Sequence, residues 1–291
     1  MRQTVAVTGA NGYVGGLVLS ALAPEFNVVS LVRIPKAEGE HKWHFDMSED
    51  EMTEILQRAS VTIIVHVAWD MATSSIDLLR SSCVAGTQRL LTAARTAGVQ
   101  RFIFISTISA FEGVRSAYGK SKLEAESLMF AHGALVLRLG LVYGNTNKGV
   151  FGGLVALATR MPIVPSIQDK VLNQYLLHER SFSSAILRAA RGEFSTERRA
   201  LTLAHPRAIC LTDLLRNIAD ARQRKVLFVP IPWVILYSVL RLAELARVPV
   251  SFRSDSLVSL VYQNPAPNFA PLADHKIDML PLLLEKSSRK M

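Results

Sequence analysis

The chain has 291 residues, of which 49% are hydrophobic and 20% are charged, and it carries a formal net charge of +9 at pH 7. This length and composition are typical of a globular protein with a sizeable core, and they exclude an intrinsically disordered chain. The two cysteines, Cys83 and Cys210, are far apart and predict no disulfide framework. The first residues enter a strand-like segment without a charged and then apolar leader, so we expect a cytoplasmic protein.

Short apolar segments in the first half predict β-strands separated by helices, at residues 5–7, 28–32, 63–65, 102–105 and 135–137. Their hydrophobicity is continuous rather than alternating, which indicates a sheet that is buried on both faces. The alternation of strands and helices predicts an α/β fold with a doubly wound parallel sheet. After Gly144 the pattern loosens, and glycines and prolines between residues 149 and 165 mark loops.

A glycine-rich segment, Thr8–Gly15, follows the first strand and precedes a helix-like run, Leu17–Leu22. In a dinucleotide-binding turn, Gly9 would allow the tight turn, Gly12 the close approach of a pyrophosphate, and Gly15 the packing of helix on strand. The phosphates would lie at the positive N-terminal end of that helix. Glycines also serve ordinary turns, so the flanking strand and helix are what favour this interpretation.

Tyr118 and Lys122 lie four residues apart within Ala117–Lys122, so both side chains share one face of a helix. A nearby ammonium favours the phenolate and is expected to lower the tyrosine pKa from its usual value near 10. Such a tyrosine can exchange a proton with an alcohol or carbonyl oxygen while a hydride moves. A solvated surface pair usually explains this spacing, but the glycine-rich turn upstream favours the catalytic interpretation.

The segment Val229–Leu240 is apolar, but its prolines and the following Arg241 and Glu244 leave it shorter than a membrane span. We expect a buried helix of a substrate-binding lobe. The alternative is a helix that lies on a membrane, with Trp233 and Leu236 as the expected contact residues.

Basic residues gather at Arg198–Arg199, Arg222–Lys225 and Lys286–Lys290. No nucleic-acid recognition module or interleaved aromatic residues accompany these clusters. We therefore expect an anionic cofactor, an anionic substrate or an acidic surface as the partner, and no nucleic acid.

Together these motifs resemble the short-chain dehydrogenase/reductase superfamily, and within it the extended or atypical branch of NAD(P)-dependent epimerases and dehydratases. Further segments are similar to the family's His-x-Ala strand, its Gly-Thr helix and its fifth and sixth strands, in the family's order: Thr62–Ala68, Val84–Leu91, Phe102–Thr107 and Leu137–Gly144. The resemblance implies a Rossmann domain over residues 1–145, rejoined around 175–190. It also implies a smaller C-terminal substrate-binding lobe over most of 146–291, and a homodimer.

The resemblance implies that Tyr118 is the general acid/base and that Lys122 lowers its pKa and binds the nicotinamide ribose. It further implies that Thr107 hydrogen-bonds the reacting oxygen. Ser106 and Ser109 compete for this role, although for Ser106 a hydroxyl that satisfies backbone groups is the preferred interpretation.

Cys83 stands where the family has an asparagine that helps to hold a structural water near the lysine. A thiol is a poor donor and acceptor, so the resemblance implies an altered proton relay. We expect a small buried thiol rather than a reactive nucleophile. This departure leaves open a second hypothesis, a cofactor-binding scaffold or assembly protein without turnover, although an intact Tyr118, Lys122 and Thr107 argue against it.

The second strand ends at Arg33, without the carboxylate that binds the adenosine ribose in NAD-preferring members. A guanidinium there can pair with a ribose 2′-phosphate, and Lys36 follows, so NADP is the expected cofactor and NAD the alternative. Asp46 matches the family aspartate beside the adenine, and a solvated carboxylate is an equal alternative. The resemblance assigns the remaining cofactor contacts to Gly9, Asn11, Gly12, Tyr13, Val14, Gly15, Met47, Val67, Ala68 and Lys122.

For the substrate, the resemblance implies a small molecule similar to a nucleotide-sugar, whose keto or hydroxy group is reduced or epimerised. A basic residue is often found four positions before His178 in sugar-nucleotide epimerases, whereas this chain has Gln174. Lys170 and Arg180 are candidate substitutes. Arg33 favours NADPH-consuming reduction over epimerisation.

Overall fold

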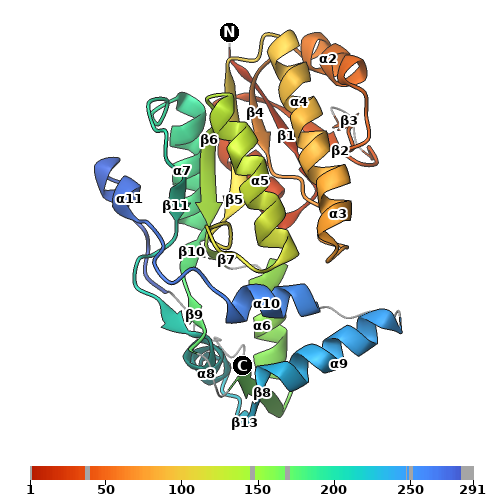
Figure 1. Ribbon diagram of the computed structural model, residues 1–291. Helices are drawn as coiled ribbons and strands as arrows, with labels where there is room; N and C mark the ends of the chain where they lie inside the picture. The colour runs from red at the N-terminus through yellow and green to blue at the C-terminus, as the bar shows by residue number, and fades with distance from the viewer. Residues whose placement is uncertain are drawn as a thin grey trace.

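The computed structural model describes residues 2–36, 40–144, 148–167, 171–246, 248 and 252–282. Lys170 and the cluster Lys286–Lys290 lie outside these residues. Within them, a parallel sheet with its helices forms the upper part of the molecule, and a smaller lobe of helices and short strand pairs lies below it (Figure 1).

The sheet has seven strands in the order β11-β6-β5-β4-β1-β2-β3, and all neighbouring pairs are parallel. From β1 the chain adds β2 and β3 on one side of β1. It then adds β4, β5 and β6 on the other side, so the direction of winding reverses between β1 and β4. Such a reversal opens a crevice at the carboxyl ends of the two strands. The strands are β1 Thr4–Thr8, β2 Asn27–Val32, β3 Glu40–Lys42, β4 Val61–His66, β5 Arg101–Thr107, β6 Leu135–Leu139 and β11 Leu201–Leu203.

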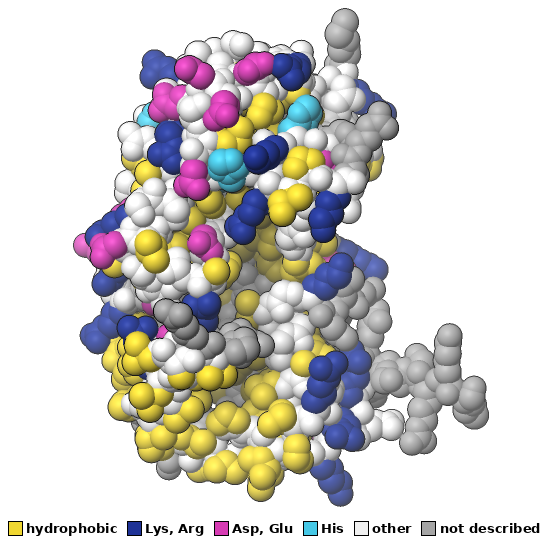
Figure 2. Space-filling model, turned by 90° about the vertical axis from the view of Figure 1, so that its right-hand side faces the viewer, with side chains coloured by type: hydrophobic (Ala, Val, Ile, Leu, Met, Phe, Trp, Pro, Cys, Tyr) yellow, Lys and Arg dark blue, Asp and Glu magenta, His cyan; other side chains and the backbone are white. Residues whose placement is uncertain are grey.

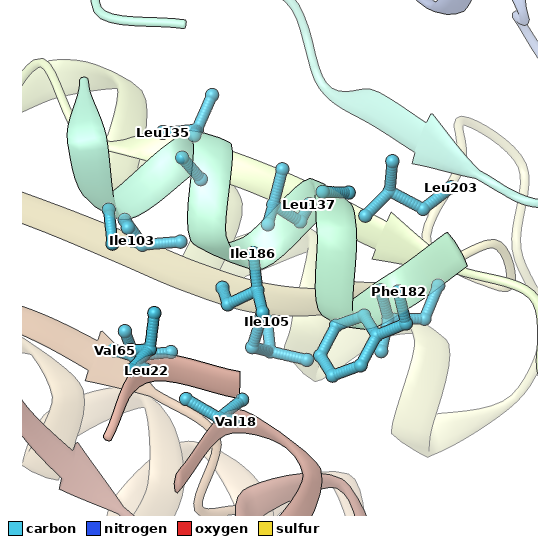
Figure 3. Packing of buried hydrophobic residues seen from close by; sticks show 14 of the residues in the cluster. Val18, Leu22, Val65, Ile103, Ile105, Leu135, Leu137, Phe182, Ile186 and Leu203 are labelled. Atoms are coloured by element: carbon cyan, nitrogen blue, oxygen red, sulfur yellow. The ribbon is translucent and has the colours of Figure 1, made fainter. Parts of the chain in front are cut away.

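Helices cover both faces of the sheet, as its continuously apolar strands require. On one face lie α1 (Tyr13–Leu22) and α7 (Glu179–Arg191), and Figure 3 shows side chains from both helices packed on the strands. On the other face lie α2 (Glu49–Arg58), α4 (Ala85–Thr96) and α5 (Ala117–Ala131). The doubly wound parallel sheet predicted from the sequence is therefore confirmed.

The chain leaves the sheet through β7 (Leu141–Tyr143) and returns through β10 (Leu176–His178), which pairs with β7. α7 follows β10 directly, and β11 then adds to the sheet edge beside β6. β11 lies beyond residues 175–190, the range that the resemblance implied for the return. Its residues Leu201 and Leu203 are fully buried, so this strand completes the core at the sheet edge.

The smaller lobe contains α6 (Gly149–Arg160), α8 (Leu211–Ala221), α9 (Trp233–Leu245) and α10 (Ser254–Val261). Two strand pairs complete it: β8 (Ile163–Ile167) with β13 (Leu227–Ile231), which are parallel, and β9 (Asn173–Gln174) with β12 (Ile209–Cys210), which are antiparallel. α11 (Ala270–Asp274) lies back against the sheet domain, where Leu272 joins the core. Across the described part of the chain, no helix combines the length and the apolar character that a membrane crossing needs.

Candidate active site

A cavity of about 870 Å³ runs along the carboxyl ends of the sheet strands and extends to α10 of the smaller lobe. It brings together motifs that are far apart in the sequence. Of the residues expected at the site, the following line it: Gly9, Asn11, Gly12, Tyr13, Val14, Gly15, Arg33, Val67, Ala68, Thr107, Tyr118 and Lys122. Asp46 and Met47 do not line it.

The glycine-rich turn at the start of α1 has the geometry of an anion cradle. Gly9 has a φ of +67°, a conformation that favours glycine, and a Cβ there would lie 2.9 Å from the backbone of Ala68. A Cβ at Gly15 would lie 2.1 Å from the carbonyl oxygen of Gly9, so only glycine lets α1 pack this close to the turn. The N-cap of α1 is Gly12, and no side chain caps the helix. These residues fit a dinucleotide pyrophosphate, because the positive end of α1 faces a cavity that they line.

Thr8 and His66 join this turn to the end of β4. The hydroxyl of Thr8 accepts hydrogen bonds from the backbone N–H groups of Val67 and Ala68, both at 3.1 Å, and lies 2.7 Å from His66 Nδ1. The Thr8 hydroxyl has one proton, and we assign it to the hydrogen bond with His66 Nδ1. The His66 proton is then on Nε2, which donates to Thr87 Oγ1 at 3.0 Å. Burial lowers the pKa of His66 to about 3, so the ring is neutral and structural.

Thr107 and Tyr118 come from two neighbouring elements. Thr107 is the last residue of β5, Tyr118 lies in the first turn of α5, and both residues line the cavity. Burial raises the pKa of Tyr118 to about 12, and the Thr107 hydroxyl acts in the opposite direction. At neutral pH the residue is therefore a phenol, which can donate a proton to an oxygen held in the cavity.

The contacts and the pKa of Lys122 differ from those expected. Its Nζ donates to the carbonyl oxygen of Ile105 at 2.8 Å and lies 4.0 Å from the centroid of the Trp69 ring. Because the side chain is buried, the pKa of Lys122 is lowered to about 7. The expected net lowering of the Tyr118 pKa is not seen, because burial dominates and the tyrosine pKa is raised.

Ser106 and Ser109, the two competitors of Thr107, have different surroundings. Ser106 donates to Glu126 Oε1 at 2.5 Å, and the same carboxylate pairs with Arg138 through Nη2 at 2.6 Å. Glu126 is only 1% exposed, so Ser106 belongs to a buried polar network that satisfies this carboxylate. Ser109 lines the cavity, and its backbone N–H donates to Thr107 Oγ1 at 3.2 Å.

Cys83 lies in a π-helical turn, Arg80–Val84, between α3 (Ile76–Leu79) and α4. Its side chain is fully buried, and its Sγ accepts a hydrogen bond from the backbone N–H of Asp70 at 3.2 Å. Burial raises the pKa of the thiol, so Cys83 is protonated at neutral pH and is no activated nucleophile.

The far end of the cavity lies beyond the glycine turn. Arg33 and Lys36 line it, and both are exposed. Three aromatic residues, Trp43, His44 and Phe45, also line this end, whereas Asp46 and Met47 do not. Asp46 is exposed to solvent, whereas Met47 is buried and its sulfur accepts the backbone N–H of His44 at 3.4 Å.

Two residues of the site carry no sequence signal. Asp255, in the first turn of α10, accepts the backbone N–H groups of Ala117 at 2.7 Å and Tyr118 at 3.0 Å. It thereby satisfies two amides at the N-terminus of α5 with a carboxylate, the charge that this helix end favours. Trp69 follows the His-x-Ala strand and lies against the Lys122 ammonium. Arg180, a candidate for substrate binding, is exposed and does not line the cavity.

Comparison with known proteins shows the family to which the chain belongs. Residues 5–161 match the model of the NAD dependent epimerase/dehydratase family. A ceramide reductase from Caulobacter vibrioides is 25% identical, over 94% of this chain and 89% of that protein. A UDP-glucose 4-epimerase from Vibrio cholerae is 29% identical, over 55% of this chain and 58% of that protein. A solved structure, dTDP-4-dehydrorhamnose reductase from Bacillus anthracis in complex with NADP, has a TM-score of 0.68 at 16% identity and covers 97% of this chain and 95% of its own.

Proposed function

The chain belongs to the NAD-dependent epimerase/dehydratase family, and we propose that it is an NADPH-dependent reductase that converts a carbonyl group to an alcohol. The observation that carries this proposal is one cavity with two ends. One end holds Thr107 and Tyr118, and the other holds Arg33.

The proposed proton transfer follows from the pKa of Tyr118. A bound nicotinamide dinucleotide supplies the hydride that adds to the carbonyl carbon. Tyr118 donates its phenolic proton to the carbonyl oxygen, because a pKa raised to about 12 keeps it protonated at neutral pH. Thr107 hydrogen-bonds the same oxygen and orients it. Lys122, when protonated, adds positive charge to this end of the cavity and favours the tyrosinate left behind.

The preference for NADPH rests on the end of β2. Arg33 lines the cavity, and none of the described residues from Leu31 to Phe45 that line it is an aspartate or a glutamate. A guanidinium can bind a ribose 2′-phosphate bidentately, whereas the ribose hydroxyls of NAD are usually held by a carboxylate at this position.

The substrate end of the cavity combines apolar side chains with uncharged polar ones, the latter including Ser256, Ser259, Gln263 and Asn264. Trp69, Met71, Phe252 and Leu260 line it, and Arg253 is the one cation that the described part of the smaller lobe contributes. A nucleotide diphosphate would be served by several cations, so we propose a carbonyl compound with a substantial apolar part. The similarity to a ceramide reductase along nearly the whole chain supports this substrate class.

Nucleotide-sugar epimerisation is the second candidate function. The similarity to a UDP-glucose 4-epimerase supports it, and Arg253 offers one contact for a diphosphate. Epimerisation returns the hydride to the same molecule, so it would proceed without net consumption of NADPH.

The proposal is tested by binding and oxidation of NADPH and NADH, with long-chain ketones and dTDP-4-keto sugars as substrates. We expect NADPH to bind about tenfold or more tightly than NADH, a difference of about 1.4 kcal/mol, and to be oxidised with the ketones. Arg33→Ala should remove most of this preference. The control is Arg95→Ala, an exposed arginine of α4 outside the cavity. Tightly retained NAD together with epimerisation of UDP-sugars would contradict the proposal and favour the second candidate.

A further inference from the structure

α9 has two apolar faces, of which one is covered by the protein. Trp233, Leu236, Tyr237 and Leu240 point inward and pack against the cluster around Leu257 of α10. The expected buried helix is wrong, because α9 has no fully buried residue. Trp233 and Leu236, the residues named for the alternative of a membrane helix, lie on the covered face.

The opposite face of α9 is apolar and exposed to solvent. Val234 is 53% exposed, Ile235 55%, Val239 57%, Leu242 66% and Leu245 68%. Their spacing places them on one stripe of the helix. An ordinary surface helix is polar on this side, and such a stripe marks an interaction site.

The strand pair β8–β13 extends this apolar stripe. The two strands are parallel with Ile163 opposite Leu227, and β13 leads through Pro232 into α9. Ile163 is 51% exposed, Leu227 61% and Val229 36%. We call these three residues and the five of the α9 stripe the docking face. Most of the exposed large hydrophobic side chains of the described chain lie in this lobe.

Basic residues flank one edge of the docking face. Arg160 lies close before β8, and Arg222, Arg224 and Lys225 precede β13. Because the two strands are parallel, Arg160 and these three residues lie at the same end of the pair, which we call the basic edge. Figure 2 shows hydrophobic side chains gathered over the lower part of the molecule, on the side from which α9 projects, with Lys and Arg along one margin.

We propose that the docking face binds an anionic membrane surface. α9 has 13 residues and is therefore roughly 20 Å long, too short to cross a bilayer core of about 30 Å. It can lie in the plane of the interface, with its outer stripe among the acyl chains and its inner face still on the protein. The basic edge complements the charge of acidic lipid headgroups, which a second copy of this positively charged chain would not supply.

α10 connects the docking face to the substrate end of the cavity. The inner face of α9 packs against α10, and Ser256, Ser259 and Leu260 of α10 line the cavity. A membrane-bound lobe would therefore place the substrate end of the cavity one helix away from the lipid surface. Membrane binding goes beyond the proposed reductase activity and is measured without turnover.

The test is flotation of the full chain with vesicles, either of pure phosphatidylcholine or of phosphatidylcholine and phosphatidylglycerol in equal parts. We expect binding to the anionic vesicles. The triple variant Ile235→Ser/Val239→Ser/Leu242→Ser should reduce it about tenfold or more, because three apolar contacts are lost. The matched control is Leu78→Ser/Phe130→Ser, which removes two exposed apolar side chains elsewhere on the surface. Thermal melting of each variant checks that the fold is retained.

A second variant tests the basic edge. Arg222→Gln/Arg224→Gln/Lys225→Gln should weaken binding to the anionic vesicles and should leave binding to pure phosphatidylcholine unchanged. Absence of vesicle binding by the parent chain, or equal binding by the parent and the triple serine variant, would overturn the proposal. A parent dimer that the serine variant converts to a monomer, without vesicle binding, would assign the docking face to a second copy.

Discussion

Asp255 and Tyr118 are joined across the two lobes: the Asp255 carboxylate accepts the backbone N–H of Tyr118 at 3.0 Å and that of the preceding Ala117 at 2.7 Å. The helix that carries the proposed acid has its own N-cap, Ser116, and a residue of the smaller lobe accepts two further amides of its first turn. Any movement of α10 would move this carboxylate. Asp255 is in this sense a positioning residue for Tyr118.

We predict that Asp255→Ala lowers kcat about tenfold and leaves the Kd of NADPH unchanged. A carboxylate at a helix N-terminus contributes up to about 1 kcal/mol, and a similar loss in the transition state corresponds to roughly this factor. Asp255→Asn, which keeps the acceptor oxygen, should recover most of the activity, and Asp220→Ala is the control. A larger effect on NADPH binding than on kcat would show that Asp255 does not act through Tyr118.

Thr8→Val should destabilise the fold by about 2–4 kcal/mol in urea denaturation. The substitution keeps the shape of the side chain, but it leaves the N–H groups of Val67 and Ala68 and the Nδ1 of His66 without their partner in a buried site. Thr8→Ser keeps the hydroxyl and should cost much less. Equal loss in both variants would mean that the methyl group, and not the hydrogen bonds, stabilises the turn.

Thr107→Ala should lower activity, whereas Ser106→Ala should lower stability. Loss of the Thr107 hydroxyl should lower turnover about a hundredfold, because it hydrogen-bonds the reacting oxygen. Ser106→Ala should lower stability by about 1–3 kcal/mol, because Glu126 loses a partner in a buried site, and should keep turnover. Steady-state kinetics and urea denaturation of both variants distinguish the two roles. The reverse pattern would make Ser106 the catalytic hydroxyl.

The stability difference between the parent chain and Lys122→Met should change with pH. In the folded protein the pKa of Lys122 is lowered from 10.5 to about 7, so between these values the unfolded state binds more protons than the folded one. The contribution of Lys122 to stability therefore increases as pH rises above 7, by an amount of the order of a few kcal/mol, and is lost as pH falls back to 7. Urea denaturation of both proteins across this range measures the difference, and a constant difference would contradict the lowered pKa.

Local patterns were sufficient to predict the sheet and the glycine turn. The left-handed conformation of Gly9 and the close contact at Gly15 both depend on residues within one short segment, which the sequence spacing specifies. The apolar strands likewise contain their own signal, because burial on both faces requires continuous hydrophobicity.

The rest of the site depends on contacts between distant elements. The spacing of Tyr118 and Lys122 specifies a shared helix face, but it does not specify that the long lysine side chain reaches the Ile105 carbonyl oxygen of β5. No motif links Asp255 to α5, since the two are brought together only by the packing of α10. In α9 both faces are apolar, so composition alone could not show that Trp233 faces inward and Ile235 outward.

Single-turnover transfer of hydride from NADPH to a ketone substrate, compared between the parent chain and Tyr118→Phe, tests the central claim most directly. The substitution removes one oxygen and should leave the Kd of NADPH unchanged, while the transfer rate falls by a factor of about 100–10,000, the range typical of a lost general acid. Tyr237→Phe, which removes a hydroxyl on the inner face of α9 outside the cavity, should match the parent. An unchanged rate in Tyr118→Phe with normal NADPH binding would contradict the account.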